Sequence, residues 1–212
     1  RFTSNSPGTV QLYIGTILPL SGKNILLPIR NSKGEADFEA VSVNPATYIN
    51  KPLSFSKKNV GKVVDTLINQ PYGWGGNLFH MDCARLVRNY FAIFGIHMPL
   101  LSKQQSTVGK VIDISTLNNQ SKKQTIIRKA VPYQSILYMP GHIGIYMGTH
   151  KGEPIMLNAL WGIKLFDEDE REYRYVVGKS IISTLSPGGD LYGFSPTKSD
   201  ILSKITVASN LY

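Results

Sequence analysis

The chain of 212 residues contains one cysteine, Cys83, and its thiol is the side chain best suited to nucleophilic chemistry. It follows Asp82 at the start of the run "CARLVRNYFAIFGI", whose apolar spacing predicts an amphipathic helix with Cys83 in its first turn. Free N–H groups and the helix dipole there would lower the thiol pKa and stabilise an oxyanion. The alternative is a small buried thiol without a chemical role.

A thiol nucleophile needs an imidazole partner, and the chain has four histidines. His142 opens the strand-like run "HIGIYMG" after a Pro-Gly turn, so we expect it at the rim of a sheet, aimed at a helix terminus. His80, His97 and His150 fall in predicted loops and turns and are weaker candidates. Asn158 interrupts the apolar run "IMLNALW", and its amide oxygen could hold one tautomer of the imidazole. His142 as an ordinary strand-end residue and Asn158 as a satisfied core amide remain open alternatives.

A zinc site is the other chemistry that a cysteine and histidines suggest. Zinc needs three or four ligands at characteristic spacings, and the sequence has no CxxC, no HExxH and no His pair at helical spacing. A site built from Cys83, His80 and His142 is therefore disfavoured. The Gly-rich "YGWGG" lacks the GK[ST] ending of a phosphate loop, so we expect neither a metal nor an organic cofactor.

Two helices and three strands would have to position these side chains. Helical spacing from Ser56, stopped by Pro71, predicts one helix, and the run after Asp82, stopped by Gly95, predicts the other. Residues 135–139, 142–148 and 154–160 have the lengths and turn signals of an antiparallel meander. The polar segment 102–125 and the C-terminal tail suggest no definite element.

The N-terminal fifth of the chain has a different pattern. Residues 9–20, 24–29 and 37–43 alternate like short strands between Gly, Ser and Asn breaks, which predicts a small barrel or hairpin array. About 45 residues is too few for an independent core, so this module should pack on the rest of the chain. Residues 44–56, with two prolines, read as a linker.

The formal net charge of +9 would suit an anionic partner, but the positive residues are scattered. The densest clusters, "SKKNVGK" and "NNQSKKQ", lack aromatic interleaving, so we interpret them as solvated faces and expect no nucleic-acid partner. No apolar run is long enough to cross a bilayer. Because natural chains begin with Met, Arg1 implies a processed or N-terminally truncated chain, and any export signal would precede it.

The combination of "PYGWGG", an Asp-Cys pair opening a helix, "FGIHMP" and, some sixty residues after the cysteine, "GHIGIYMG" resembles the NlpC-type cysteine endopeptidases of bacterial cell walls. This resemblance implies an α+β, papain-like catalytic domain over residues 57–212, with a helix-borne Cys packed on an antiparallel sheet. The segment 1–50 resembles the SH3-like β-barrel that precedes such domains, here truncated N-terminally. The resemblance also implies a location in the bacterial cell envelope, periplasmic or extracellular.

The same resemblance implies hydrolysis of peptidoglycan stem peptides at the bond between γ-D-glutamate and a diamino acid. Cys83 matches the nucleophile, His142 the general base and Asn158 the third polar residue. The matches to substrate-binding positions are Tyr72, beside the nucleophile, Asp82, which would hold the free α-amine of L-Ala, and Ser102, which would help to bind that amine.

The chain departs from the family pattern at four positions. Ala84 and Arg85 replace a small Ser-Gly pair after the cysteine, and Leu100 and Leu101 replace a polar pair after "FGIHMP". Two other functions therefore stay open: a catalytically silent peptidoglycan-binding protein, and a thiol acyltransferase or amidase that acts on another substrate.

Overall fold

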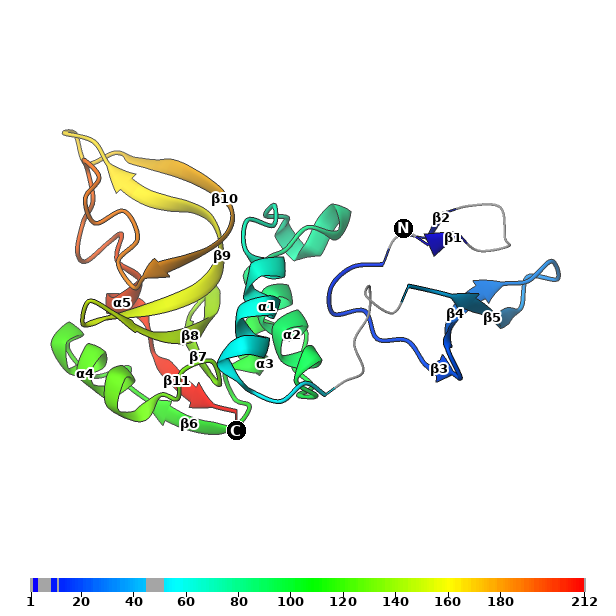
Figure 1. Cartoon of the computed structure of the whole chain (residues 1–212). Helices are drawn as coiled ribbons and strands as arrows, with labels where there is room; N and C mark the ends of the chain where they lie inside the picture. The colour runs from blue at the N-terminus through cyan, green and yellow to red at the C-terminus, as the bar shows by residue number, and fades with distance from the viewer. Residues whose placement is uncertain (1, 4–8, 11, 45–51, 212) are drawn as a thin grey trace.

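The computed structural model describes residues 2–3, 9–10, 12–44 and 52–211. Its centre is a six-stranded antiparallel sheet with the strand order β10-β9-β8-β7-β11-β6 (Figure 1). The strands are β6 (Lys110–Asp113), β7 (Ser135–Met139), β8 (His142–His150), β9 (Glu153–Phe166), β10 (Glu172–Thr184) and β11 (Val207–Asn210). The predicted meander is thus confirmed as β7, β8 and β9.

Helices cover both faces of this sheet. On one side, α1 (Lys57–Leu67) and α2 (Cys83–Ile93) share an apolar core with Ile143 and Ile145 of β8, and the short α3 (Ser102–Gln105) follows α2. On the other side, α4 (Asn119–Lys129) and α5 (Ile201–Lys204) pack with Tyr146 (Figure 1). Because side chains alternate along a strand, β8 contributes to both cores and is buried on both faces. This mixed helix and antiparallel sheet architecture confirms the predicted fold class.

Helix α2 begins and ends where its sequence requires. The Asp82 carboxylate accepts a hydrogen bond of 2.7 Å from the backbone N–H of Arg85, a helix N-cap. The face that is turned to the sheet is fully buried and consists of Leu86, Val87, Tyr90 and Phe91. Gly95, with φ +82°, ends the helix in a conformation that costs other residues more. The Cys83 thiol is thereby fixed at the N-terminal end of a firmly packed helix.

The N-terminal part contains two small sheets. Strands β1 (Phe2–Thr3) and β2 (Thr9–Val10) pair with each other, and β3 (Leu20–Ser21), β4 (Asn24–Arg30) and β5 (Ala36–Ser42) form a three-stranded sheet. Ile25, Leu27, Val41 and Val43 make its small core. These sheets are consistent with an SH3-like part. The predicted strand over 9–20 is wrong for residues 12–19, which form turns and irregular chain.

Two further expectations need correction. The polar segment 102–125, for which no definite element was expected, contains α3, β6 and the start of α4. "NNQSKKQ" is no simple solvated face, because Lys122 is buried and its Nζ donates to the Ser203 carbonyl at 2.7 Å. Part of the predicted linker, residues 45–51, lies outside the described residues, while Leu53 donates its N–H to Ile93 at 3.0 Å.

Candidate active site

The Cys83 thiol lies in the first turn of α2, partly exposed and in contact with the core between α2 and the sheet. It accepts from the backbone N–H of Ile143 and lies against the N–H groups of Cys83 and Ala84. Burial nevertheless raises its pKa above the ordinary value, with a smaller contribution from the Asp82 charge. The expectation of a lowered pKa was therefore wrong, because desolvation outweighs the N–H groups.

His142 is the first residue of β8 and is buried, with 8% of its surface exposed. Its Nε2 lies 3.2 Å from the Oδ1 of Asn158, which leaves Nδ1 as the nitrogen available to a neighbouring group. Burial lowers the His142 pKa to about 4, while the Asn158 bond opposes that shift. The imidazole is therefore neutral near pH 7, the state in which it can accept a proton.

Asn158 lies on β9 with no exposed surface. Besides its Oδ1 contact to His142, its Nδ2 donates to the carbonyl of Met156 at 3.1 Å and approaches Ser183 Oγ at 3.3 Å. These donor bonds fix the orientation of the amide, so its oxygen must face the imidazole and the ring N–H must be on Nε2. The amide thus selects the tautomer whose Nδ1 is a base.

The Cys83 thiol contacts the backbone next to His142. The N–H that Cys83 receives belongs to the peptide unit joining His142 to Ile143, so the thiol lies at the start of β8. Within the described residues, no hydrogen bond joins the Cys83 thiol to the His142 ring. Bonds between a nucleophile and its base are often formed only after substrate binds, so the lack of a direct bond here does not exclude such a pair.

Tyr72 lies beside the thiol, in the segment that leads into α2. Its backbone N–H donates to Gly178 of β10 at 2.8 Å, and its ring lies 5.9 Å from that of Trp161. Burial, followed by the negative charges that Cys83 and Asp82 can carry, raises the Tyr72 pKa to about 12. Its hydroxyl therefore stays protonated and can donate a hydrogen bond at the thiol.

Asp82 and Ser102 lie in different elements, Asp82 at the start of α2 and Ser102 at the start of α3. Asp82 is adjacent to the thiol and uses Oδ1 as the helix cap. Ser102 is the first residue of α3, where its carbonyl accepts from the Ser106 N–H at 3.0 Å. Among the described contacts, none joins the Ser102 side chain to Asp82.

Gln105, which the sequence did not single out, supports the start of α2 from the same short helix. Its side chain is fully buried, and Nε2 donates to the carbonyls of Ala84 at 2.9 Å and Pro99 at 2.8 Å. Such a residue carries no sequence signal, because an isolated Gln in a polar segment reads as solvent-exposed. In the described part of the chain, no three His, Cys, Asp or Glu side chains lie close enough together to hold a metal ion.

Comparison with known proteins places this geometry in a family. The model of the NlpC/P60 family matches residues 69–176, about half of the chain, and this span includes Tyr72, Cys83, His142 and Asn158. The chain belongs to the NlpC/P60 family. A comparison with curated proteins gives no significant match.

Solved structures show the same fold. An NlpC/P60 endopeptidase from Photobacterium damselae subsp. piscicida superposes with a TM-score of 0.82 at 25% identity, covering 93% of this chain and 48% of its own. An NlpC/P60 family protein from Bacillus cereus gives a TM-score of 0.51 at 12% identity, covering 92% of this chain and 52% of its own. The chain thus spans about half the length of these relatives.

Arg85, one of the departures from the NlpC/P60 pattern, has a clear structural role. Its Nη1 donates to the Gly76 carbonyl at 2.9 Å, and its guanidinium lies 5.9 Å from the centre of the Phe79 ring. Both partners belong to the 3-10 segment η2 (Trp74–Phe79), in which Gly75, Gly76, Leu78 and Phe79 all have positive φ. Arg85 therefore ties this strained loop to the helix turn that carries Cys83.

The other departures leave apolar side chains in solvent. Leu100 and Leu101 are exposed by 66% and 59%. Ala84 is half-buried, and its contacts here are made by its backbone, with the N–H against the Cys83 thiol and the carbonyl bonded to Gln105.

Proposed function

We propose that this NlpC/P60 protein is a cysteine endopeptidase that hydrolyses peptidoglycan stem peptides. The observation that carries the proposal is the position of Cys83, at the N-terminal turn of α2 and against the first peptide unit of β8. A neutral His142, held by Asn158 at 3.2 Å, opens that same strand. The endopeptidase described from Photobacterium damselae supports the reaction class, and the family resemblance supports peptidoglycan as substrate.

In the proposed mechanism the pair rests as thiol and neutral imidazole. His142 takes the thiol proton as Cys83 sulfur bonds to the scissile carbonyl carbon, and the carbonyl oxygen becomes an oxyanion. The backbone N–H of Cys83 and the Tyr72 hydroxyl are placed to donate to it. The imidazolium then protonates the leaving amine as the C–N bond breaks. Water, deprotonated by His142, attacks the thioester carbonyl carbon, and His142 returns the proton to the Cys83 sulfur as the C–S bond breaks.

The finer assignments also belong to this proposal. The bond cleaved is that between γ-D-glutamate and a diamino acid, and Asp82 with Ser102 binds the free α-amine of the stem. A carboxylate is the expected partner of an ammonium group, and the second oxygen of Asp82 supplies it while Oδ1 caps α2. Residues 1–50 serve as an SH3-like module and 57–212 as the catalytic domain, acting in the bacterial cell envelope, periplasmic or extracellular.

Purified muropeptides with defined stems test the proposal. Stem tripeptides and tetrapeptides, with and without a free L-Ala amine, are incubated with the protein, and the products are identified by mass spectrometry. We expect cleavage after D-glutamate that disappears in Cys83→Ala and in Cys83→Ser. Asp82→Asn should raise KM for the free-amine substrate far more than for the blocked one.

The rival functions predict different results from the same samples. Binding of muropeptides without any turnover would identify a silent wall-binding protein. Release of product from ester or amide substrates but not from stem peptides would identify another thiol hydrolase or acyltransferase. Turnover retained in Cys83→Ala would rule out the mechanism itself.

A further inference from the structure

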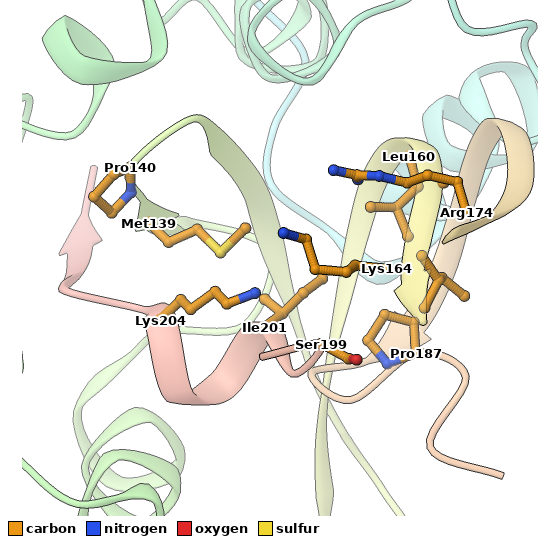
Figure 2. Close-up of a pocket in the computed structure, with 11 residues that line it drawn as sticks. Met139, Pro140, Leu160, Lys164, Arg174, Pro187, Ser199, Ile201 and Lys204 are labelled. Atoms are coloured by element: carbon orange, nitrogen blue, oxygen red, sulfur yellow. The ribbon is translucent and has the colours of Figure 1, made fainter. Parts of the chain in front are cut away.

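A pocket of about 230 Å³ lies on the side of the six-stranded sheet opposite to Cys83. Its apolar wall includes Leu160 of β9 and Ile201 of α5, which belong to the core on the α4 and α5 side. Three cationic side chains from three elements line it: Lys164 of β9, Arg174 of β10 and Lys204 of α5. Figure 2 shows their nitrogen-bearing ends directed into the same space.

Lys164 and Arg174 form an unusual pair. They face each other directly in the register of β9 and β10. Like charges opposite each other in an antiparallel pair are destabilising unless something compensates them. Glu172 provides partial compensation, with one carboxylate oxygen 2.6 Å from Lys164 and the other 3.2 Å from Arg174. One carboxylate is therefore divided between two cations.

Lys204 adds a third positive charge without a carboxylate of its own. Its Nζ donates to the Lys198 carbonyl, a neutral acceptor. The nearby Asp200 is buried and already occupied, since Oδ1 accepts from Ser186 at 2.6 Å and Oδ2 caps α5 at Ser203 with a bond of 3.0 Å. Burial lowers the pKa of Lys204, and the charge of Lys164 adds to that shift.

The charges in and beside the pocket do not balance. In the described part of the chain, the charge interactions at this pocket set three cations, Lys164, Arg174 and Lys204, against two carboxylates, Glu172 and Asp200. The ion pairs of Glu172 are partly exposed, with side-chain exposures of 31% to 49%. Exposed pairs of this kind stabilise a fold only slightly, so stability does not explain why three cations gather at one pocket. An anion that entered from solvent would satisfy all three.

We propose that this pocket binds a phosphate ester, with the phosphate on Lys164, Arg174 and Lys204 and a small apolar group against Leu160 and Ile201. A planar guanidinium with two ammonium groups suits the several oxygens of a phosphate better than it suits one carboxylate. The phosphate takes over the bonds that Glu172 makes in the free protein. A soluble phosphate ester and a lipid phosphate headgroup share this chemistry.

Calorimetric titration of the whole chain with phenyl phosphate tests the site, with inorganic phosphate and benzoate as reference probes. We expect phenyl phosphate to bind most tightly, because only it has both the phosphate and the apolar group. Arg174→Gln and Lys204→Ala should each weaken binding about tenfold, the loss of one hydrogen bond between charged groups. Glu172→Gln should tighten it several-fold, because it removes the competing carboxylate.

Lys198→Ala is the matched control, since its ammonium pairs with Glu170 at 3.1 Å and does not line the pocket. Absence of phenyl phosphate binding, equal weakening in Lys198→Ala, or weaker binding in Glu172→Gln would each overturn the proposal. The gain expected in Glu172→Gln cannot be mimicked by misfolding.

Vesicles of phosphatidic acid in phosphatidylcholine identify the source of the phosphate. Sedimentation of the protein with them, lost in Arg174→Gln but kept in Lys198→Ala, would assign a lipid headgroup. Failure to sediment while phenyl phosphate still binds would assign a soluble ester. If Arg174→Gln and Lys198→Ala lose sedimentation equally, the vesicles attract the net positive charge of the protein and do not bind at this pocket. A lipid source would then be ruled out.

Discussion

At the scale of single residues, the site is organised so that neither member of the thiol and imidazole pair is charged at rest. Burial raises the Cys83 pKa and lowers the His142 pKa to about 4, so both shifts oppose a thiolate and imidazolium pair. In the proposed mechanism the proton therefore moves from Cys83 to His142 as the sulfur attacks, not beforehand. This resting state makes reactivity toward simple electrophiles strongly dependent on pH.

Alkylation of Cys83 by iodoacetamide should therefore be slow at neutral pH and should still accelerate above pH 9, because the raised pKa keeps the sulfur protonated. Intact-mass spectrometry can follow the reaction directly, since the chain has a single cysteine. A rate that already levels off below pH 7 would indicate a preformed thiolate and imidazolium pair. Cys83→Ser provides the unlabelled control.

Stability should fall in mild acid because of His142. Its pKa is about 4 in the folded protein, against an ordinary 6.5, so the unfolded chain binds more protons between these values. The free energy of unfolding should thus decrease as the pH falls from 6.5 to 4, by up to about 3 kcal/mol. Urea denaturation at several pH values measures it.

His142→Gln should remove most of this dependence, whereas His150→Gln, at the exposed end of β8, should leave it unchanged. Identical slopes in wild type and His142→Gln would refute the assignment to this residue.

At the scale of elements, the loop η2 depends on the helix it precedes. Arg85 bonds the Gly76 carbonyl at 2.9 Å and covers the Phe79 ring. Arg85→Ala should free the loop, raising amide hydrogen exchange across residues 74–79 by about five- to tenfold, the effect of roughly 1 kcal/mol of lost local stability.

Arg85→Lys keeps the charge but loses the planar fork, so it should restore only part of the protection. Arg88→Ala, one turn further along α2, is the matched control and should leave the exchange of the loop unchanged. If Arg88→Ala has as large an effect, the loop responds to the helix charge and not to this contact.

Sequence patterns predicted some helices and strands and missed others for a physical reason. Helices α1 and α2 follow from regular apolar spacing between clear stops, because each buries one face on the sheet. Helix α4 was missed because it buries only Ile126 and Lys122, and a buried lysine looks like a solvated one. Strand β10 was missed because, as an edge strand, it exposes residues 172–176 and carries charges there.

The candidate site, too, could be predicted from the sequence only in part. The sequence suggested three site residues because each is a chemically distinctive residue at the end or at an interruption of a regular pattern: Cys83, His142 and Asn158. The direction of the Cys83 pKa was not predictable, because desolvation depends on what three-dimensional packing places over the thiol. The anchoring roles of Arg85 and Gln105 likewise depend on loop geometry, which no local pattern encodes.

At the scale of the whole molecule, the N-terminal part contacts the loop η2, which precedes Cys83. The ring of Tyr13 stacks on Phe79 with the centroids 4.5 Å apart and the planes at 9°. Gly15, at φ +88°, passes so close to Asn89 of α2 that an added Cβ would lie 2.7 Å from that side chain. A chain of contacts thus runs from the N-terminal part through Phe79 to Arg85 and α2.

Tyr13 and Phe79 should therefore be coupled energetically. In a double-mutant cycle with Tyr13→Ala and Phe79→Ala, we expect a coupling of about 1 kcal/mol in the free energy of unfolding, typical of aromatic pairs. Chemical denaturation of the four proteins measures it. The control is a second cycle that combines Phe79→Ala with Tyr192→Ala, because Tyr192 is 69% exposed. The two changes in the free energy of unfolding should then simply add. Additivity in the Tyr13 cycle would mean that the two parts are not joined through this stack.

The segment that leads into Cys83 is held by a strand that comes about 110 residues later in the chain. Ser180 of β10 accepts from the Gln70 N–H at 2.9 Å and bonds the Leu67 carbonyl, while Gly178 holds Tyr72. During synthesis, Tyr72 and Cys83 leave the ribosome long before these partners exist. The segment that carries Tyr72 can therefore complete this arrangement only after β10 has been synthesised.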